Sequence, residues 1–386
     1  MPTARVNINP ETISFARERA GYPTGRIAEK MRVKEDQWLQ WEQGEKKPTT
    51  NQLITLAKYL DRTPAFFYLE DLPEEEQPLS EFRTINNQLL LEASPKLIKA
   101  IREAKRNREI ILELYQNQGK KLEEIPSIKP DGSDISSLAQ KIRNWLEIPL
   151  EEQKRWSGSS TTLTQWKEVL ENKDIYVVQY PYVEVSESRG FALAKSQLPI
   201  IGINSKDSSN ARIFTLIHEL IHVLLRDSVM INDELTEYFP NGQRNIEQFC
   251  NRLAAEILVP SDDLRQAFDV ETEPVKEIKG LSRTYGVSTY VVLIRLKTEK
   301  LISKRVYEGL LSEVSFYGQS RQSDGGDPYY TRIVQKGRLF MRTAFESYFQ
   351  EQITLGELAN ITGWKVPNLN ELAAKTFGWP EEDSYI

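Results

Sequence analysis

Residues 218–222 read H-E-x-x-H, and this run contains both histidines of the 386-residue chain. On an α-helix, residues four apart lie on one face, so His218 and His222 can reach the same metal ion. Glu219 lies one step further round the helix, where it can reach a water molecule bound to that ion. Two imidazole ligands with a carboxylate base beside them are typical of zinc hydrolases. The pattern therefore predicts a zinc centre with His218 and His222 as ligands and Glu219 as the general base.

The residues around this motif predict a buried helix. Over residues 212–226 the side chains are apolar on nearly every side of the helix, apart from the motif itself. A helix that is hydrophobic all round packs in a core. Two imidazoles in such a position need polar partners, and a metal ion would supply them.

The third metal ligand follows less directly from the sequence. A zinc hydrolase normally uses three protein ligands and leaves the fourth position to water. No histidine remains, so the third ligand must be Glu, Asp or, less favourably, the single cysteine, Cys250. The predicted helix 246–258 offers Glu247 and Glu256, which point to opposite sides because nine residues turn a helix by about 900°. Both flank its apolar stripe, so periodicity does not choose between them, and this ligand set also suits manganese or iron.

Further elements must position these groups. Three short segments rich in Val, Ile and aromatic residues, at 175–180, 190–194 and 198–204, predict β-strands ahead of the metal helix. Such a sheet would form one wall of a substrate cleft, along which an extended peptide could add as a strand. The sequence does not show which strand is the edge. Helices are predicted at 95–118, 134–146, 163–170, 332–349, 355–362 and 368–377, with two more inside 275–302.

The N-terminal residues 11–70 read as five short helices. The turn W-E-x-G-E-x-x-P, which starts at Trp41, resembles the XRE type of helix-turn-helix, whose third helix enters the DNA major groove. Here that helix begins with Glu35 and Asp36, which oppose approach to phosphates. Residues 1–70 hold eleven Lys and Arg against nine Asp and Glu, so no strong positive charge offsets them. The domain could bind DNA weakly or recognise a protein, and its candidate contacts are Gln37, Gln40, Lys46 and Lys47.

The run from Arg189 to Pro260 resembles the ImmA/IrrE family of metallopeptidases. The matching pieces are R-G-F-A-L from residue 189, F-T-x-x-H-E-x-x-H from residue 214, and E-x-x-x-N-x-x-A-A-E-x-L-x-P from residue 247. The resemblance implies that Glu247 is the third ligand and that Asn251 orients it from outside the coordination shell. Cys250 stands where the family commonly has alanine, which implies packing. A helix-turn-helix domain is a common companion of this family.

This resemblance also implies a function. We expect a zinc-dependent endopeptidase that cleaves or inactivates a regulatory protein encoded nearby, such as a helix-turn-helix repressor, in stress, mobile-element or toxin–antitoxin control. In that chemistry Glu219 takes a proton from water and passes it to the departing amine. No histidine is left to stabilise the oxyanion, so Tyr238, Tyr329, Tyr330 and Arg189 are the candidates. The alternative is a DNA-binding transcriptional regulator or antitoxin whose metallopeptidase-like domain senses or binds without proteolysis.

The expected fold class is α+β and mainly helical, in four parts. A helix-turn-helix domain spans 1–75, a linker and long amphipathic helix 76–130, a zincin-like metallopeptidase domain with a small sheet 131–316, and a flexible linker with C-terminal helices 317–386. The net charge of −6 gives no general case for binding nucleic acid or membranes. The single cysteine, with no signal peptide or membrane span in the sequence, predicts a cytoplasmic protein. A homodimer is compatible with the sequence.

Overall fold

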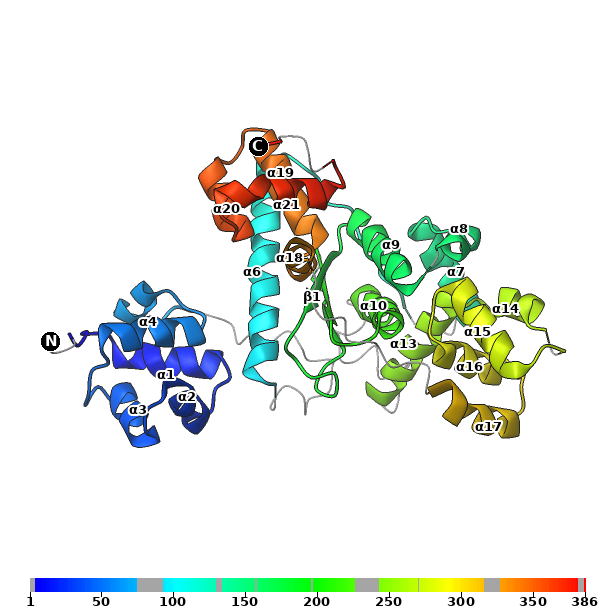
Figure 1. Ribbon diagram of the computed structural model, residues 1–386, viewed down its shortest axis with the longest axis horizontal. Helices are drawn as coiled ribbons and strands as arrows, with labels where there is room; N and C mark the ends of the chain where they lie inside the picture. Colours follow the sequence, from blue (N-terminus) through cyan, green and yellow to red (C-terminus); the bar gives the residue numbers. More distant parts are fainter. Residues whose placement is uncertain are drawn as a thin grey trace. The chain divides into compact units, whose positions relative to one another are not determined.

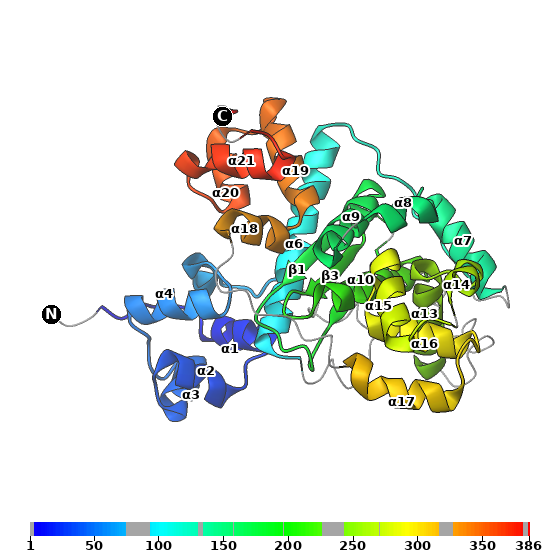
Figure 2. The ribbon, with the colours of Figure 1, turned by 45° about the vertical axis from the view of Figure 1, so that its right-hand side comes forward.

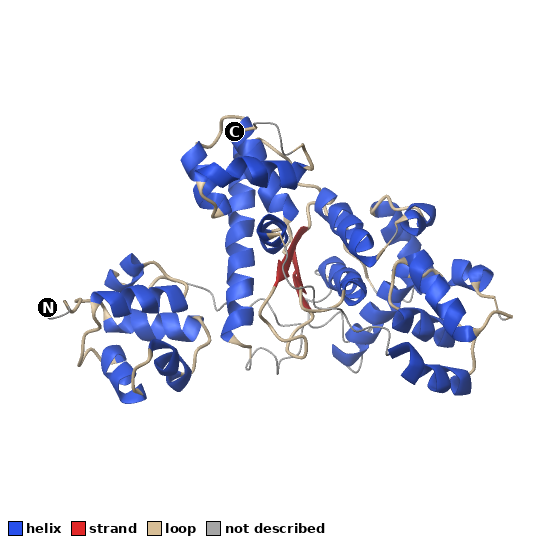
Figure 3. Cartoon of the chain, in the orientation of Figure 1, coloured by secondary structure: helices blue, strands red, loops and turns tan. Residues whose placement is uncertain are grey.

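The computed structural model describes residues 4–74, 93–129, 134–156, 158–195, 197–225, 243–269, 271–315, 327–380 and 385–386. Helices dominate the described chain, and one small sheet lies among them (Figure 3), which agrees with the expected α+β class. The chain divides into two compact units, Met1–Glu103 and Ala104–Ile386. The finer boundaries at residues 75, 130 and 316 stay predictions. No described helix has both the length and the apolar character needed to cross a membrane.

The first unit is a small helical domain. It contains α1 (Pro10–Arg19), α2 (Thr24–Met31), α3 (Glu35–Glu42), α4 (Thr50–Tyr59) and the 3-10 helix η1 (Pro64–Tyr68). These elements occupy the places of the five predicted helices, the last as a 3-10 turn. Trp38 and Trp41 of α3 are buried with ring centroids 5.8 Å apart, so the inner face of α3 is fixed in the core. Thr49 begins α4 with a capping box that pairs it reciprocally with Gln52.

The second unit carries the sheet and the metal motif, and α6 (Pro95–Asn117) runs across the boundary between the units. Its strands are β1 (Tyr176–Tyr180), β2 (Gly190–Leu193) and β3 (Ile200–Asn204), each within two residues of the predicted bounds. Its other helices are α7 (Ile135–Trp145), α8 (Leu150–Arg155), α9 (Ser159–Asn172), α10 (Ser209–Leu224), α13 (Gln243–Leu258), α14 (Ser261–Ala267), α15 (Pro274–Tyr285), α16 (Thr289–Thr298), α17 (Lys304–Ser315), α18 (Pro328–Lys336), α19 (Arg338–Phe349), α20 (Leu355–Thr362), η3 (Val366–Asn368) and α21 (Leu369–Phe377).

The sheet has the order β1-β3-β2, with β1 parallel and β2 antiparallel to the central β3. Helix α10 packs on one face of it, against β2 and β3, while α18 and α19 lie against β1 (Figures 1 and 2). Both outer strands are edges of the sheet. Among the described residues, β2 pairs only with β3, so the backbone groups on its other side have no partner strand there.

Helices α10 and α13 form the centre of the hydrophobic core. Of α10, Ile213, Leu216, Ile217 and Leu220 are completely buried, together with several of the residues that follow to Leu225. Each such side chain contributes about 1.5–3 kcal/mol through burial. Helix α13 packs against α10 on one side and α7 on the other. The predicted buried helix is thereby confirmed, and it is held from several directions.

Four elements differ from the prediction. The short helices α8 and α14 were missed, because six or seven residues give almost no helical period to read, and α17 was missed as well. The predicted helix 332–349 is instead two helices that meet at Gly337, whose φ of 84° and ψ of 138° are not helical. A Cβ at this glycine would lie 2.7 Å from the Val177 carbonyl oxygen. The chain therefore bends where it touches β1, and only glycine fits there.

Candidate metal centre

His218 and His222 of α10 and Glu247 of α13 bring their donor atoms together. The two imidazole Nε2 atoms are 3.1 Å apart. The Glu247 carboxylate places Oε2 3.2 Å from Nε2 of His218 and Oε1 3.4 Å from Nε2 of His222. Tetrahedral ligands at zinc distances are separated by about 3.3 Å. The three side chains therefore fit one zinc ion.

Burial differs across this cluster. The side chain of His222 is 6% exposed, whereas that of Glu247 is 35% exposed. Glu247 therefore marks the side of the cluster that faces solvent. Helix α10 is positioned at its start by Ser208, whose hydroxyl accepts the backbone N–H of Ala211. The predicted ligand role of each residue stays a prediction, but the geometry that the role needs is present.

Glu219 lies beside the cluster and is 5% exposed. Among the described residues, its Oε2 atom has no hydrogen-bond partner. Burial raises the pKa of Glu219 to about 7, with His218 opposing the shift and Glu247 adding to it. A carboxyl with a pKa near neutrality suits a general base. The unpartnered oxygen is where such a base would accept a proton from water.

The charges of the metal-free cluster are coupled. Burial alone would lower the pKa of His218, but its hydrogen bond to Glu247 and the charges of Glu219 and Glu247 outweigh burial and raise it. Burial and the neighbouring His218 lower the pKa of His222 to about 4. Burial works against ionisation of Glu247, yet the two imidazoles keep the pKa of its carboxyl below the ordinary value. The metal-free site thus favours a proton between His218 and Glu247, which a metal ion would displace.

Two neighbours of Glu247 on α13 support the histidines. Asn251 hydrogen-bonds to His218 and helps to raise the pKa of that imidazole. The expected role of Asn251 in orienting Glu247 stays a prediction. Cys250 is buried, with Sγ 3.9 Å from Nδ1 of His222, on the side of the ring away from the cluster. Burial raises the pKa of the Cys250 thiol, which disfavours the thiolate that a metal would need.

Glu256 has a separate structural role. It forms a buried ion pair with Arg295 of α16 and accepts hydrogen bonds from the backbone N–H and the hydroxyl of Ser261, at 3.0 and 2.7 Å. These contacts join the end of α13 to α14 and α16. Of the two glutamates that periodicity left open, the structure places Glu247, the one that the resemblance implied, at the histidines and Glu256 on the opposite side of α13.

The candidates for oxyanion stabilisation have other partners. Tyr329 stacks on Trp364, with ring centroids 4.5 Å apart. Arg189 forms an ion pair with Asp207 at 3.0 Å. Tyr330 is half exposed on α18, and Tyr238 lies outside the described residues. For Arg189, Tyr329 and Tyr330 the role in stabilising the oxyanion therefore stays a prediction.

The candidate contacts of the N-terminal domain lie on or after α3. Gln37 and Gln40 are partly exposed on the helix, and Lys46 and Lys47 are exposed beyond its end. The Glu35 carboxylate lies at the start of α2, with both oxygens 3.4 Å from where a Cβ on Gly25 would be. The amino end of a helix attracts anions. Glu35 therefore occupies a position at which an anion would otherwise be stabilised.

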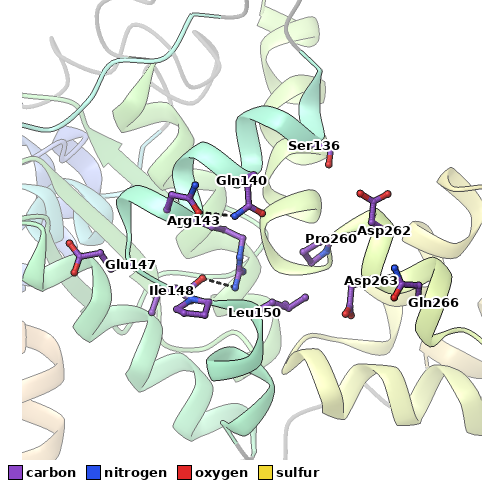
Figure 4. Close-up of a pocket in the computed structure, with 12 residues that line it drawn as sticks. Ser136, Gln140, Arg143, Glu147, Ile148, Leu150, Pro260, Asp262, Asp263 and Gln266 are labelled. Atoms are coloured by element: carbon purple, nitrogen blue, oxygen red, sulfur yellow. Dashed lines mark hydrogen bonds between the residues drawn. The ribbon is translucent and has the colours of Figure 1, made fainter.

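A cavity of about 810 Å³ lies elsewhere in this unit, between α7 and α14 (Figure 4). Its wall includes Arg143, a buried cation that donates to the carbonyls of Ile148 and Ile257 at 2.9 and 2.7 Å. Asp263, also in the wall, binds Lys154 and Tyr285. These charged side chains are already paired, and none of the three cluster residues lines the cavity. It is distinct from the candidate metal centre.

A comparison with protein families gives independent support. Residues 171–297 match the family model of the IrrE N-terminal-like domain, peptidase family M78. This segment runs from the end of α9 into α16 and contains His218, Glu219, His222 and Glu247. No curated protein matches the chain. The segment is thus metallopeptidase-like, in line with the resemblance seen in the sequence, while the N-terminal unit and the C-terminal helices lie outside the IrrE-like match.

Sequence reasoning missed two contributors to this site. Gly190 was part of the matching run R-G-F-A-L, but nothing in the sequence shows that it lies against Glu219. The contact between Cys250 and His222 was also missed. Both helices were predicted, but nothing in the sequence shows which of their faces pack together.

Proposed function

We propose that the chain is a zinc-dependent endopeptidase. The observation that carries this proposal is the set of donor distances among His218, His222 and Glu247, all between 3.1 and 3.4 Å, with a buried carboxylate beside them. The IrrE-like segment supports the same chemistry. A site that only held a structural metal would use a fourth protein ligand. Among the described residues, the cluster offers three.

The three residues would hold zinc, which when bound acidifies water and polarises a peptide carbonyl. Glu219 would take a proton from the attacking water at its unpartnered Oε2 and later transfer it to the departing amine. The apolar surroundings exclude bulk water and keep this carboxyl poised near neutrality. That unpartnered oxygen favours proteolysis over a purely sensing role, since a sensor needs no base at this position.

The substrate would bind as an extended peptide along β2. This strand packs against the metal helix, and its side away from β3 has no partner strand among the described residues. Backbone hydrogen bonds from an added strand give affinity without sequence preference. Selectivity would then come from another part of the chain, which makes the N-terminal helical domain the candidate for recognising a partner.

We further propose that the substrate is a regulatory protein encoded nearby, such as a helix-turn-helix repressor, and that the N-terminal domain acts in its recognition. Glu35 and Asp36 at the start of α3 support a protein partner more than DNA, because phosphates repel both carboxylates. Weak DNA contacts from Lys46 and Lys47 remain compatible with this role.

The experiment is co-expression of the chain with each protein encoded beside it, followed by the length of that protein on an immunoblot. The wild type should shorten one of them, and Glu219→Gln should leave it intact while keeping its own metal and fold. Glutamine is nearly isosteric with glutamate but cannot accept the proton. The matched control is Glu168→Gln on α9, which changes a glutamate outside the site. Cleavage by the Glu219→Gln variant at a comparable rate would refute the zincin mechanism here.

A further inference from the structure

Gly190 opens β2 at the point where the edge strand meets the metal helix. A Cβ at this position would lie 2.5 Å from Cγ2 of Thr215 and 3.1 Å from both Cγ and Oε1 of Glu219. The first distance is shorter than real side chains tolerate, and the other two are tighter than most observed contacts. The strand and the base therefore touch only because residue 190 has no side chain.

The backbone does not require glycine here. The φ of Gly190 lies outside the left-handed region, unlike that of Gly337, so an L-residue could adopt its conformation. The need for glycine comes from the packing of the strand against Thr215 and Glu219. This separates Gly190 from the glycines whose role is to allow a turn.

The strand is also held firmly in this position. The Ser188 hydroxyl donates to the Gly190 carbonyl at 3.0 Å and lies 2.9 Å from the hydroxyl of Tyr180. Asn204, which is buried on β3, donates to the carbonyl of Ser188 at 2.8 Å. Because these bonds fix the entry to β2, an added methyl group at residue 190 would displace Glu219 and Thr215 rather than the strand.

We infer that Gly190 is a positioning residue for the catalytic base: its bare Cα lets the Glu219 carboxylate lie between α10 and the substrate-binding edge of β2. This inference rests on the proposed function. The same contact sets the distance from the base to a peptide added to β2. A side chain at residue 190 would leave the metal ligands in place and misplace the base alone.

The test uses the full chain loaded with Co²⁺ and acetohydroxamate as the probe, a small chelator that would bind the metal and hydrogen-bond to Glu219. Gly190→Ala should keep one cobalt per chain but weaken acetohydroxamate binding by about tenfold or more, the value of one charge-assisted hydrogen bond. Gly202→Ala is the matched control: its Cβ would meet the Phe191 ring at 2.3 Å on the other face of the sheet. That variant should bind the probe as the wild type does.

A double-mutant cycle separates positioning from general damage. Glu219→Asp alone should weaken binding of the probe. Adding Gly190→Ala to that variant should weaken binding little further, because the shorter carboxylate side chain no longer contacts residue 190. Thr215→Ser removes the 2.5 Å conflict, so Gly190→Ala with Thr215→Ser should regain thermal stability but not probe affinity. This pair also serves if the single Ala variant does not fold.

The outcomes distinguish the two proposals. If wild-type protein binds no cobalt, the proposed metallopeptidase function fails. If cobalt binds but Gly190→Ala with Thr215→Ser holds acetohydroxamate as tightly as wild type, or if the effects of Gly190→Ala and Glu219→Asp simply add, the positioning role of Gly190 is overturned while the metal centre stands.

Discussion

The effect of Glu219→Gln on the stability of the metal-free protein should become more favourable as the pH rises. Burial raises the pKa of this carboxyl from 4.5 to about 7. Because the pKa of Glu219 is higher in the folded than in the unfolded state, the folded protein is more stable when Glu219 is protonated. Its penalty is nearly absent below pH 4.5, grows as the pH rises from 4.5 to 7, and is nearly constant above 7. Linkage gives a penalty of about 1 kcal/mol at pH 5 and about 3 kcal/mol at pH 8.

The glutamine side chain that Glu219→Gln introduces carries no such penalty, although its amide must also be buried and that costs about 1–3 kcal/mol at every pH. The pH-independent cost cancels when two pH values are compared. The benefit of Glu219→Gln should therefore be larger at pH 8 than at pH 5 by about 2–3 kcal/mol. The assay is urea unfolding of chelator-treated protein, followed by circular dichroism at both pH values.

Glu256→Gln is the control for this prediction. It also replaces a buried glutamate, but one that pairs with Arg295 and Ser261. Breaking that ion pair should lower the free energy of unfolding by several kcal/mol at both pH values, since the buried Arg295 charge then lacks a negatively charged partner in Glu256. A benefit of Glu219→Gln that is the same at pH 5 and pH 8 would refute the reasoning that burial destabilises the ionised base.

Three further outcomes are expected. Glu247→Ala should deplete the metal, measured by elemental analysis of purified protein, while Glu256→Ala should retain it; the reverse result would transfer the third-ligand role to Glu256. Cys250→Ala should keep the metal and destabilise the protein by about 1 kcal/mol in thermal unfolding, as expected for a small loss of buried volume, whereas loss of the metal would make the thiol a ligand. The N-terminal residues 1–75 and the full chain should bind their own promoter DNA weakly or not at all in fluorescence anisotropy at physiological salt, and Glu35→Gln with Asp36→Ser should strengthen that binding; tight, sequence-specific binding by the unchanged chain would favour the regulator alternative.

The parts of the site that follow a helical or strand period were predictable. The four-residue spacing of His218 and His222 places both side chains on one face of α10, whatever the surroundings of the helix. The three strands were marked by runs of Val, Ile and aromatic residues, and the structure has them within two residues of the predicted bounds. In both cases a local pattern determines the local structure.

Contacts between elements were not predictable in this way. Periodicity left Glu247 and Glu256 equivalent, and only the family resemblance indicated Glu247. The packing of α13 against α10 and α7 brings Glu247 to the histidines and pairs Glu256 with Arg295. Gly337 separates two helices because β1 lies against it. Gly190 is needed because Glu219 lies against it. The sequence alone does not show which neighbour makes a given glycine necessary.

The most direct test of the central claim is X-ray absorption spectroscopy of the zinc-loaded protein at the zinc edge. Ligation by His218, His222, Glu247 and water predicts a first shell of nitrogen and oxygen only, at about 2.0–2.1 Å, with the outer scattering of two imidazoles. A zinc–sulfur distance of about 2.3 Å would place Cys250 in the site and contradict the account, as would a first shell without imidazole scattering.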